Sequence, residues 1–180
     1  MSAAVVAVHL SAKHEFSKTT VRQVRLVAGL GVEGDCHAGA QVQHRSRVRR
    51  DPTQPNLRQV HLVAAELLDE LAAAGYDVTP GRLGENVTTR GVDLLGLATG
   101  TTVSLGRDAL VTVTGLRNPC SQIDRFSPGL LDRLVGRADA GEVVRRAGVM
   151  GVVVLGGTVR AGDDVDVAPP PGHPVRLAPV

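Results

Sequence analysis

Ala109-Leu110-Val111-Thr112-Val113-Thr114-Gly115-Leu116 runs directly into Arg117-Asn118-Pro119-Cys120. The first part of this stretch is rich in β-branched side chains, a composition that favours a β-strand. The Asn-Pro pair ends the strand, because proline has a fixed φ and no backbone N–H to donate to a sheet. One thiol therefore follows a strand on a turn, beside a cationic side chain that favours the thiolate, the form that attacks or binds metal. Alternatively, this cysteine has no chemical role and packs in the core as a small apolar residue.

Runs of similar composition recur along the chain and are separated by turns rich in glycine, of which the sequence has 21. Short strands at this density are typical of an antiparallel or mixed barrel or sandwich. The fold class predicted from the sequence is mainly β, a β-barrel with a few short peripheral helices. The expected strands, besides 109–116, are 4–9, 21–27, 101–105, 149–155 and 165–167.

Three short helices are expected around these strands. The first covers 63–74, where Val63, Leu67, Leu68 and Leu71 share one face and Gly75 follows as a C-terminal cap. The second begins at Ser127-Pro128, because serine caps helices and proline suits the first helical position, and it turns Leu130, Leu131 and Leu134 inward. The third covers 140–146.

The length of 180 residues suits one domain with a substantial core. We assign residues 1–167 to this domain and 168–180 to a proline-rich tail, which we expect to be extended because prolines exclude a helix or a central strand. No apolar run approaches the roughly 20 residues of a membrane helix, and the first residues lack the charged region of a signal peptide. We therefore expect a soluble, cytoplasmic protein without membrane contact.

The cysteine count and the charge distribution limit the possible functions. Two cysteines cannot hold an iron–sulfur cluster, which usually takes four thiolates, so redox electrons would have to come from a separate protein. The net charge is only +2, but His44 and five arginines cluster within a short segment, which suits an anionic partner. Nucleic acid is disfavoured because aromatic residues, on which bases stack, make up only 2% of the chain. The arginines are Arg45, Arg47, Arg49, Arg50 and Arg58.

Several segments, in one order along nearly the whole chain, resemble the MOSC domain, named after the C-terminal domain of molybdenum cofactor sulfurase. The resemblance implies a β-barrel that binds molybdenum cofactor, with the cysteine equivalent to Cys120 as the metal ligand. It is strongest to the group of the bacterial hydroxylaminopurine reductase, which reduces N-hydroxylated compounds, although the helical segment that often follows the barrel in that group has no counterpart here. The segments are Gly31–Asp35, Arg58–Leu62, Gly84–Thr89, Gly91–Leu97, Thr114–Cys120 and Gly148–Val152.

A molybdopterin ligand needs cations for its phosphate, amides and hydroxyls for its pterin, and one soft metal ligand, and the sequence offers each of these. Cys120 is the expected metal ligand, and Arg117 and Asn118 are the expected catalytic neighbours that hold the thiolate or a substrate oxygen. Lys18 resembles the lysine expected to reach the phosphate as a point charge. The other expected cofactor-binding residues are Asp35, His37, Arg45, Arg58, Gln59, His61, Glu85, Asn86 and Thr88.

Most of these residues also have a purely structural interpretation. Asn118 forms a turn with the following proline, and Asp35 caps a turn instead of orienting His37. Lys18 is then an exposed lysine at the start of a strand, and His61 is a hydrogen-bonded interior histidine. Glu85 ties loops together, and Thr88 is an ordinary strand residue.

The leading functional interpretation is an oxidoreductase that reduces a small N-hydroxylated substrate and is itself reduced by an external electron-donor reductase. One alternative is a sulfur carrier that uses a persulfide on Cys120. Another is a module that binds or delivers molybdenum cofactor without turnover. Neither nucleic acid nor membrane is an expected partner, and the oligomeric state stays open, with a homodimer as one possibility.

Overall fold

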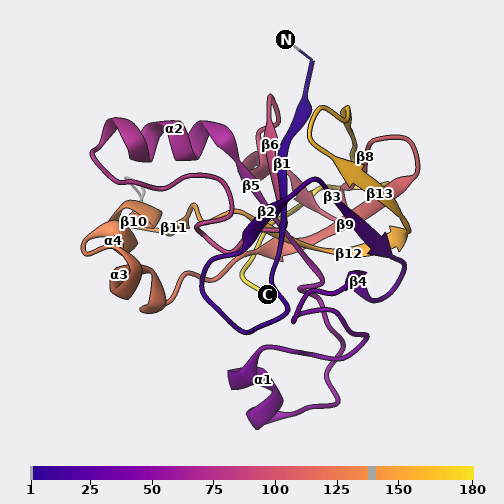
Figure 1. Ribbon diagram of the computed structural model, residues 1–180, viewed down its shortest axis with the longest axis horizontal. Helices are drawn as coiled ribbons and strands as arrows, with labels where there is room; N and C mark the ends of the chain where they lie inside the picture. The colour runs from indigo at the N-terminus through magenta and orange to yellow at the C-terminus, as the bar shows by residue number, and fades with distance from the viewer. Residues whose placement is uncertain (1, 138–140) are drawn as a thin grey trace.

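The computed structural model describes residues 2–137 and 141–180. Its main element is an eight-stranded sheet in the order β14-β8-β9-β12-β5-β6-β1-β2, in which only β5 and β6 pair in parallel (Figure 1). The bounds are β1 (Ala4–Leu10), β2 (Thr19–Val21), β5 (Val60–Ala64), β6 (Val87–Arg90), β8 (Thr102–Leu105), β9 (Ala109–Leu116), β12 (Val149–Leu155) and β14 (Val165–Ala168). Five of the six expected strand segments overlap strands of this sheet, namely β1, β8, β9, β12 and β14, and the sixth, 21–27, contains β3 (Gln23–Val27).

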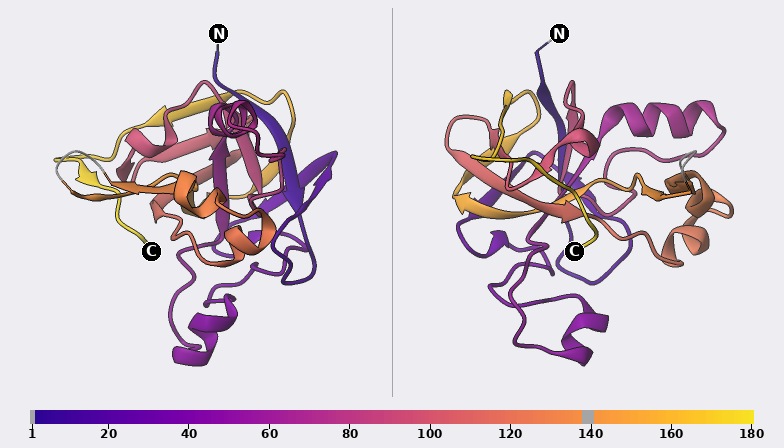
Figure 2. Two further views of the ribbon diagram at one scale, coloured as in Figure 1. Left: turned by 90° about the vertical axis from the view of Figure 1, so that its left-hand side faces the viewer. Right: turned by 180° about the vertical axis from the view of Figure 1, so that it is seen from behind.

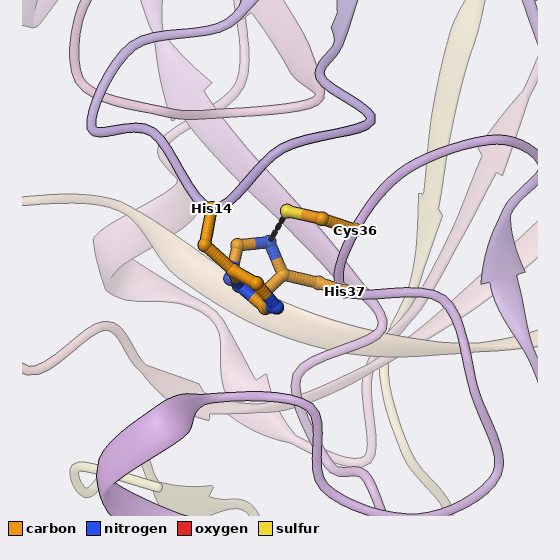
Figure 3. A group of neighbouring side chains, drawn as sticks. All are labelled: His14, Cys36 and His37. Carbon is orange, nitrogen blue, oxygen red and sulfur yellow. Dashed lines mark hydrogen bonds between the residues drawn. The ribbon is translucent and has the colours of Figure 1, made fainter.

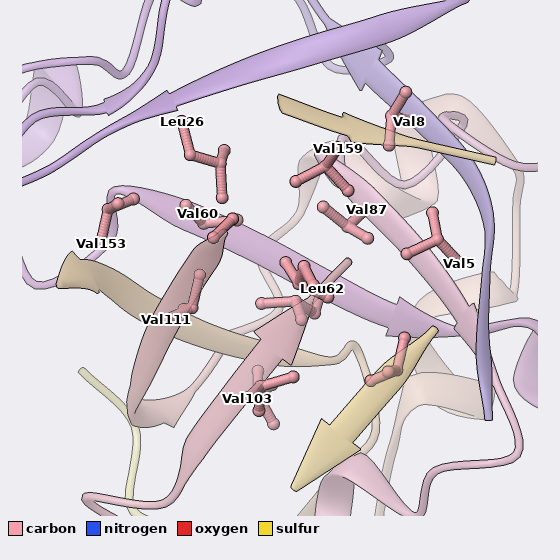
Figure 4. Close-up of a cluster of buried hydrophobic side chains, with 14 of the residues drawn as sticks. Val5, Val8, Leu26, Val60, Leu62, Val87, Val103, Val111, Val153 and Val159 are labelled. Carbon is pink, nitrogen blue, oxygen red and sulfur yellow. The ribbon is translucent and has the colours of Figure 1, made fainter. Parts of the chain in front are cut away.

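A second sheet, of three strands, covers one side of the main sheet. It has the order β13 (Gly157–Arg160), β3 (Gln23–Val27) and β4 (Gly31–Val32). Leu26 and Val159 of this sheet belong to the same buried cluster as Val60, Leu62 and Val111 of the main sheet (Figure 4). The main core therefore lies between the two sheets. Two short ribbons complete the strands: β10 (Val135–Arg137) with β11 (Val143–Arg145), and β7 (Ala98–Thr99) with β15 (Val175–Arg176).

The predicted mainly β class is confirmed, but the main sheet does not close into a barrel. The reason lies in the edge of β1 that faces away from β6, because two different partners share it. Its second half pairs with β2 from Val8 to Leu10. Its first half exchanges backbone hydrogen bonds with the turn before β14, where Val5 N donates to Asp163 O at 2.8 Å and Gly162 N donates to Val5 O at 2.8 Å. These few bonds draw the two ends of the sheet together without a continuous ladder.

The first expected helix begins later than predicted. The helix α2 covers Ala65–Ala73, because Val63 and Ala64 still pair with β6 as the last residues of β5. The apolar face was predicted correctly: Leu67, Leu68 and Leu71 are buried in one cluster with Val63. Gly75 follows the helix with a φ of +88°, which glycine adopts at little cost.

The second expected helix is present, but it starts later than predicted, and another short helix precedes it. Ser127 ends α3 (Gln122–Phe126), since its N–H donates to Ile123 O at 2.9 Å. Gly129, with a φ of +79°, then begins α4 (Leu130–Leu134), in which Leu130 and Leu134 are buried and Leu131 is partly buried.

The third expected helix was also wrong in its described part. Residues 143–145 form β11, in keeping with the strand preference of two adjacent valines, and residue 140 lies outside the described residues. The basic cluster, by contrast, contains a helix that the sequence did not predict, α1 (Arg45–Arg50), on a long loop that projects from the sheets (Figure 2). A 3₁₀ turn, η1 (Leu94–Gly96), precedes β7.

The proline-rich tail is extended where β15 pairs with β7 and then returns to the domain. Leu177 is buried, and Leu116 N at the end of β9 donates to Ala178 O at 2.8 Å. No helix in the described residues is both long and apolar enough to span a bilayer.

Candidate functional site

A cavity of about 540 Å³ lies among the loops that follow β1, β4 and β9 and the loop that precedes β6. The starts of β5 and β12 contribute His61 and Met150 to its wall. Nine of the predicted site residues line it, among 19 lining residues in total. The nine are Lys18, His37, Arg45, Arg58, His61, Asn86, Arg117, Asn118 and Cys120.

Lys18 and Asp35 form a buried ion pair on one side of this cavity. Lys18 Nζ lies 2.5 Å from Asp35 Oδ2, and both side chains are almost fully excluded from solvent. Burial lowers the pKa of Lys18, although Asp35 partly offsets this effect. Burial alone would raise the pKa of Asp35, but the hydrogen bonds from His37 and the charge of Lys18 outweigh it and hold that pKa below its usual range. Lys18 is buried, so the interpretation of it as an exposed lysine does not hold.

Asp35 does not line the cavity; it holds the surrounding loops together. Its Oδ2 also accepts hydrogen bonds from Asn86 Nδ2 at 3.1 Å and from Ser11 N at 3.2 Å. Its Oδ1 accepts from His37 N at 2.9 Å. One carboxylate thus joins the loops after β1 and β4 to the loop before β6, and a charged acceptor makes each bond stronger than a neutral one.

Two arginines in the cavity wall lack partners for part of their guanidinium groups. Arg58 Nε and Arg117 Nη1 are buried and form no hydrogen bond within the described residues. Burial lowers the pKa of Arg58 to about 10, with further lowering from Arg47 and Arg117, and burial also lowers the pKa of Arg117. Buried cations with open donors are costly unless an acceptor reaches them, so this wall suits an anionic ligand.

Cys120 presents its thiol to the same cavity from an exposed turn. Arg117 N donates to Gly148 O at 3.0 Å, and Ile123 N donates to Cys120 O at 3.0 Å, so both ends of the turn are fixed. The nearest polar contact of the thiol is Gln122 Oε1, at 3.5 Å. Both Cys120 and Cys36 are free thiols. A fixed backbone with an accessible sulfur is the arrangement that a metal ligand needs.

Asn118, beside this thiol, is also exposed. Its Oδ1 accepts a hydrogen bond from Arg145 Nε at 3.2 Å, which ties the turn to β11. The contact fits the structural interpretation of Asn118 as a turn residue, while its position in the cavity wall keeps it beside the expected ligand.

Besides Asp35, three predicted cofactor-binding residues are not part of the cavity wall. Gln59 is buried and bridges the sheets by donating to Gly29 O at 2.7 Å and accepting from Val153 N at 3.0 Å. Glu85 is buried, which raises its pKa, and it accepts hydrogen bonds from Gly81 N and from Thr88 Oγ1. These contacts fit the structural alternatives for Glu85 and Thr88.

His61 is buried and belongs to the cavity wall. Burial, with Arg117 nearby, lowers its pKa well below the usual value, so the ring is neutral. Its Nε2 lies 2.8 Å from Ala147 O, to which a neutral ring can donate only if Nε2 carries the proton. The ring is thus both a hydrogen-bonded interior histidine and a cavity residue.

The sequence did not single out two histidines that line the cavity, His14 and His44. The ring of His37 packs against that of His44 with centroids 4.4 Å apart and meets His14 edge-on at 5.2 Å. Burial lowers the pKa of His44 to about 3, and the charges of His37 and Arg58 contribute. The signals in the sequence were the nearness of His14 to Lys18 and the place of His44 in the basic cluster, and neither marks a side chain of the cavity wall.

One family model matches this chain, that of the MOSC domain, over residues 47–166. The matched range includes Arg58, His61, Asn86, Arg117 and Cys120. Lys18, Asp35 and His37 precede it. No curated protein sequence matches the chain.

Three solved structures show a similar fold. The YuaD protein from Bacillus subtilis is 22% identical with a TM-score of 0.72, over 93% of this chain and 96% of that one. YiiM from Escherichia coli is 21% identical with a TM-score of 0.60, over 97% and 73% of the two chains. YiiM from Geobacillus stearothermophilus is 18% identical with a TM-score of 0.59, over 92% and 75%. At these identities the likeness shows the fold alone.

Proposed function

Because the chain belongs to the MOSC domain family, whose members in general bind molybdenum cofactor, we propose that it is an oxidoreductase that reduces small N-hydroxylated compounds. In this proposal the Cys120 thiolate is the protein ligand of molybdenum. The observation that carries it is the position of this accessible thiol in one cavity with Arg58 and Arg117, whose buried donors lack partners.

The residues of the cavity fit the cofactor in size, charge and ligand type. A volume of about 540 Å³ is in the range of small-molecule pockets. Arg58, Arg117 and Lys18 would hold the phosphate, because they are the partly or fully buried cations of the wall. Asn86 would meet the polar edge of the pterin. The thiol of Cys120 is the soft donor that this type of metal centre prefers.

When bound, the cofactor would supply the electrons that reduce the N–O bond. Reduction of an N-hydroxyl group to an amine takes up an electron pair and a pair of protons and releases water. The chain has too few cysteines for an iron–sulfur cluster of its own, so a separate reductase is the proposed electron donor. The exposed position of the 118–122 turn leaves the thiol side of the cavity accessible to a substrate.

The test uses protein purified from a host that makes molybdenum cofactor. The molybdenum and pterin contents per chain are measured first. The reduction of hydroxylamine and of a hydroxylaminopurine is then measured with a chemical electron donor. Molybdenum and pterin near one per chain, together with turnover, are the expected result. Retention of cofactor without turnover would favour a delivery module. Absence of metal and pterin, with sulfane sulfur on Cys120, would favour a sulfur carrier.

Replacement of Arg58 by alanine is expected to lower pterin occupancy. Loss of one hydrogen bond between charged groups costs about 1.5–3 kcal/mol, which corresponds to a roughly tenfold to hundredfold weaker affinity. Pterin per chain after gel filtration is the measurement, and R25A is the control, because Arg25 is exposed on β3 and carries the same charge. Equal occupancy in R58A and R25A would reject the role of Arg58 in phosphate binding.

A further inference from the structure

A thiol and two imidazoles converge beside the cavity, and two of the three residues line it. His14 comes from the loop after β1, and Cys36 and His37 come from the turn after β4 (Figure 3). One donor atom from each of the three lies within 4.8 Å of the other two. The Cys36 Sγ to His37 Nδ1 distance is 3.3 Å.

This separation is close to what one bound ion requires. Zinc lies about 2.3 Å from a cysteine sulfur and about 2.0–2.1 Å from a histidine nitrogen, so a tetrahedral site places the two donors about 3.6 Å apart. The side chain of His14 is exposed, and its rotation can bring the third donor closer without displacing buried atoms. To share a metal, His14 has to rotate, and His37 Nδ1, which also lies 3.3 Å from Asp35 Oδ1, has to give up that contact.

Backbone contacts fix the two ligands from the turn after β4. Cys36 N donates to Ser11 O at 2.8 Å, and His37 N donates to Asp35 Oδ1 at 2.9 Å. Asp35 is in turn held by the buried ion pair with Lys18. The position of these two ligands is thus set by the fold, so metal binding would lose little conformational freedom in the backbone.

The ligand type selects the metal. Thiolate and imidazole are ligands that zinc takes, as copper also does, whereas magnesium and calcium prefer oxygen ligands. Three protein ligands leave one position of a tetrahedral ion open, as in catalytic zinc sites. His14 and His37 both line the cavity, so a metal held by them would lie beside the space that the proposed cofactor and substrate share.

We propose that His14, Cys36 and His37 form a second metal site, which binds Zn²⁺ beside the cavity independently of Cys120. The site does not depend on molybdenum, since it uses none of the residues that we assign to the phosphate or to the metal of the cofactor.

Cobalt(II) reports on such a site, because it replaces zinc and a thiolate ligand gives it a charge-transfer absorption in the near ultraviolet. We expect the full chain, freed of metal by a chelator, to bind one Co²⁺ with this absorption and to lose it on addition of Zn²⁺. The C36S variant should lack the absorption, and H14A should bind at least about tenfold more weakly, as even the loss of an outer-shell partner costs that much. Cys120→Ala is the matched control and should retain the absorption.

The outcomes separate this proposal from the proposed function. Absorption that survives in C36S and disappears in Cys120→Ala would assign the thiol ligand to Cys120 and overturn the second site, as would absence of the absorption in the unaltered chain. Weaker cobalt binding by H14A could not be attributed to misfolding, because His14 is exposed and its truncation disturbs no core contact. Molybdenum content measured on the same variants should be normal in C36S, so that either proposal can fail alone.

Discussion

The Cys120→Ala protein is expected to contain at most about a tenth of the molybdenum of the unaltered chain and to reduce no N-hydroxylated compound above background. The reason is that this variant removes a direct ligand, and even the loss of an outer-shell partner commonly costs about 10–100-fold in metal affinity. The thiol is exposed and makes only one weak polar contact, so its removal leaves the packing intact. Elemental analysis and turnover with a chemical electron donor are the measurements.

Cys36→Ala is the matched control for this experiment, because it removes the other thiol of the chain. It should keep both molybdenum and turnover. Pterin should remain measurable in Cys120→Ala if Arg58, Arg117 and Lys18 hold the phosphate without the metal bond. Full turnover in Cys120→Ala would contradict the assignment of the ligand.

The largest expected effect on stability comes from Asp35→Ala, which should lower the free energy of unfolding by about 3–5 kcal/mol, the usual cost of leaving one partner of a buried ion pair alone. The ammonium of Lys18 would remain buried without its carboxylate, and the hydrogen bonds to Ser11, His37 and Asn86 would be lost. Urea unfolding followed by circular dichroism measures the difference. Asp69→Ala, which breaks the exposed pair with Arg90, is the control and should leave the unfolding midpoint unchanged.

Asp35 should also give the stability a dependence on pH. Its pKa is lower in the folded protein than in the unfolded chain, so its contribution is present at neutral pH and is lost as the pH falls through the folded value. The difference in unfolding free energy between the unaltered protein and D35N should therefore narrow below roughly pH 4, near the unfolded pKa of aspartate. A difference that stays constant from neutral to acidic pH would show that Asp35 is not ionised in the fold.

The strands were predicted better than the helices, for a physical reason. The runs 109–116 and 149–155 coincide with β9 and β12, because β-branched residues in unbroken runs fit a pleated sheet wherever they lie in it. Helix starts depended on tertiary partners that the sequence does not reveal. Val63 has the spacing of a helical face, yet pairing with Thr88 of β6 keeps it in a strand.

The site was predicted in part for a related reason. Residue type indicates which groups a cofactor would require, but not on which side of a strand each group lies. Gln59 and Glu85 have suitable polar groups and instead join backbone segments inside the fold. His14 and His44 reach the cavity from loops. Loops have neither the two-residue period of a strand nor the 3.6-residue period of a helix, so the spacing of residues in the sequence does not show which side chains share a face.

The hydrogen bond between His61 and Ala147 joins residues 86 positions apart, and the strands that carry the cavity wall pair over similar separations. Chains dominated by such distant pairings fold slowly, on a timescale of roughly milliseconds to seconds, because each pairing must first close a long loop. The part of the cavity wall that His61 and Met150 form is absent until β5 has paired with β12. The cofactor of the proposed function would therefore enter a fold whose distant strands have already paired, and that fold has to be stable before the cofactor arrives.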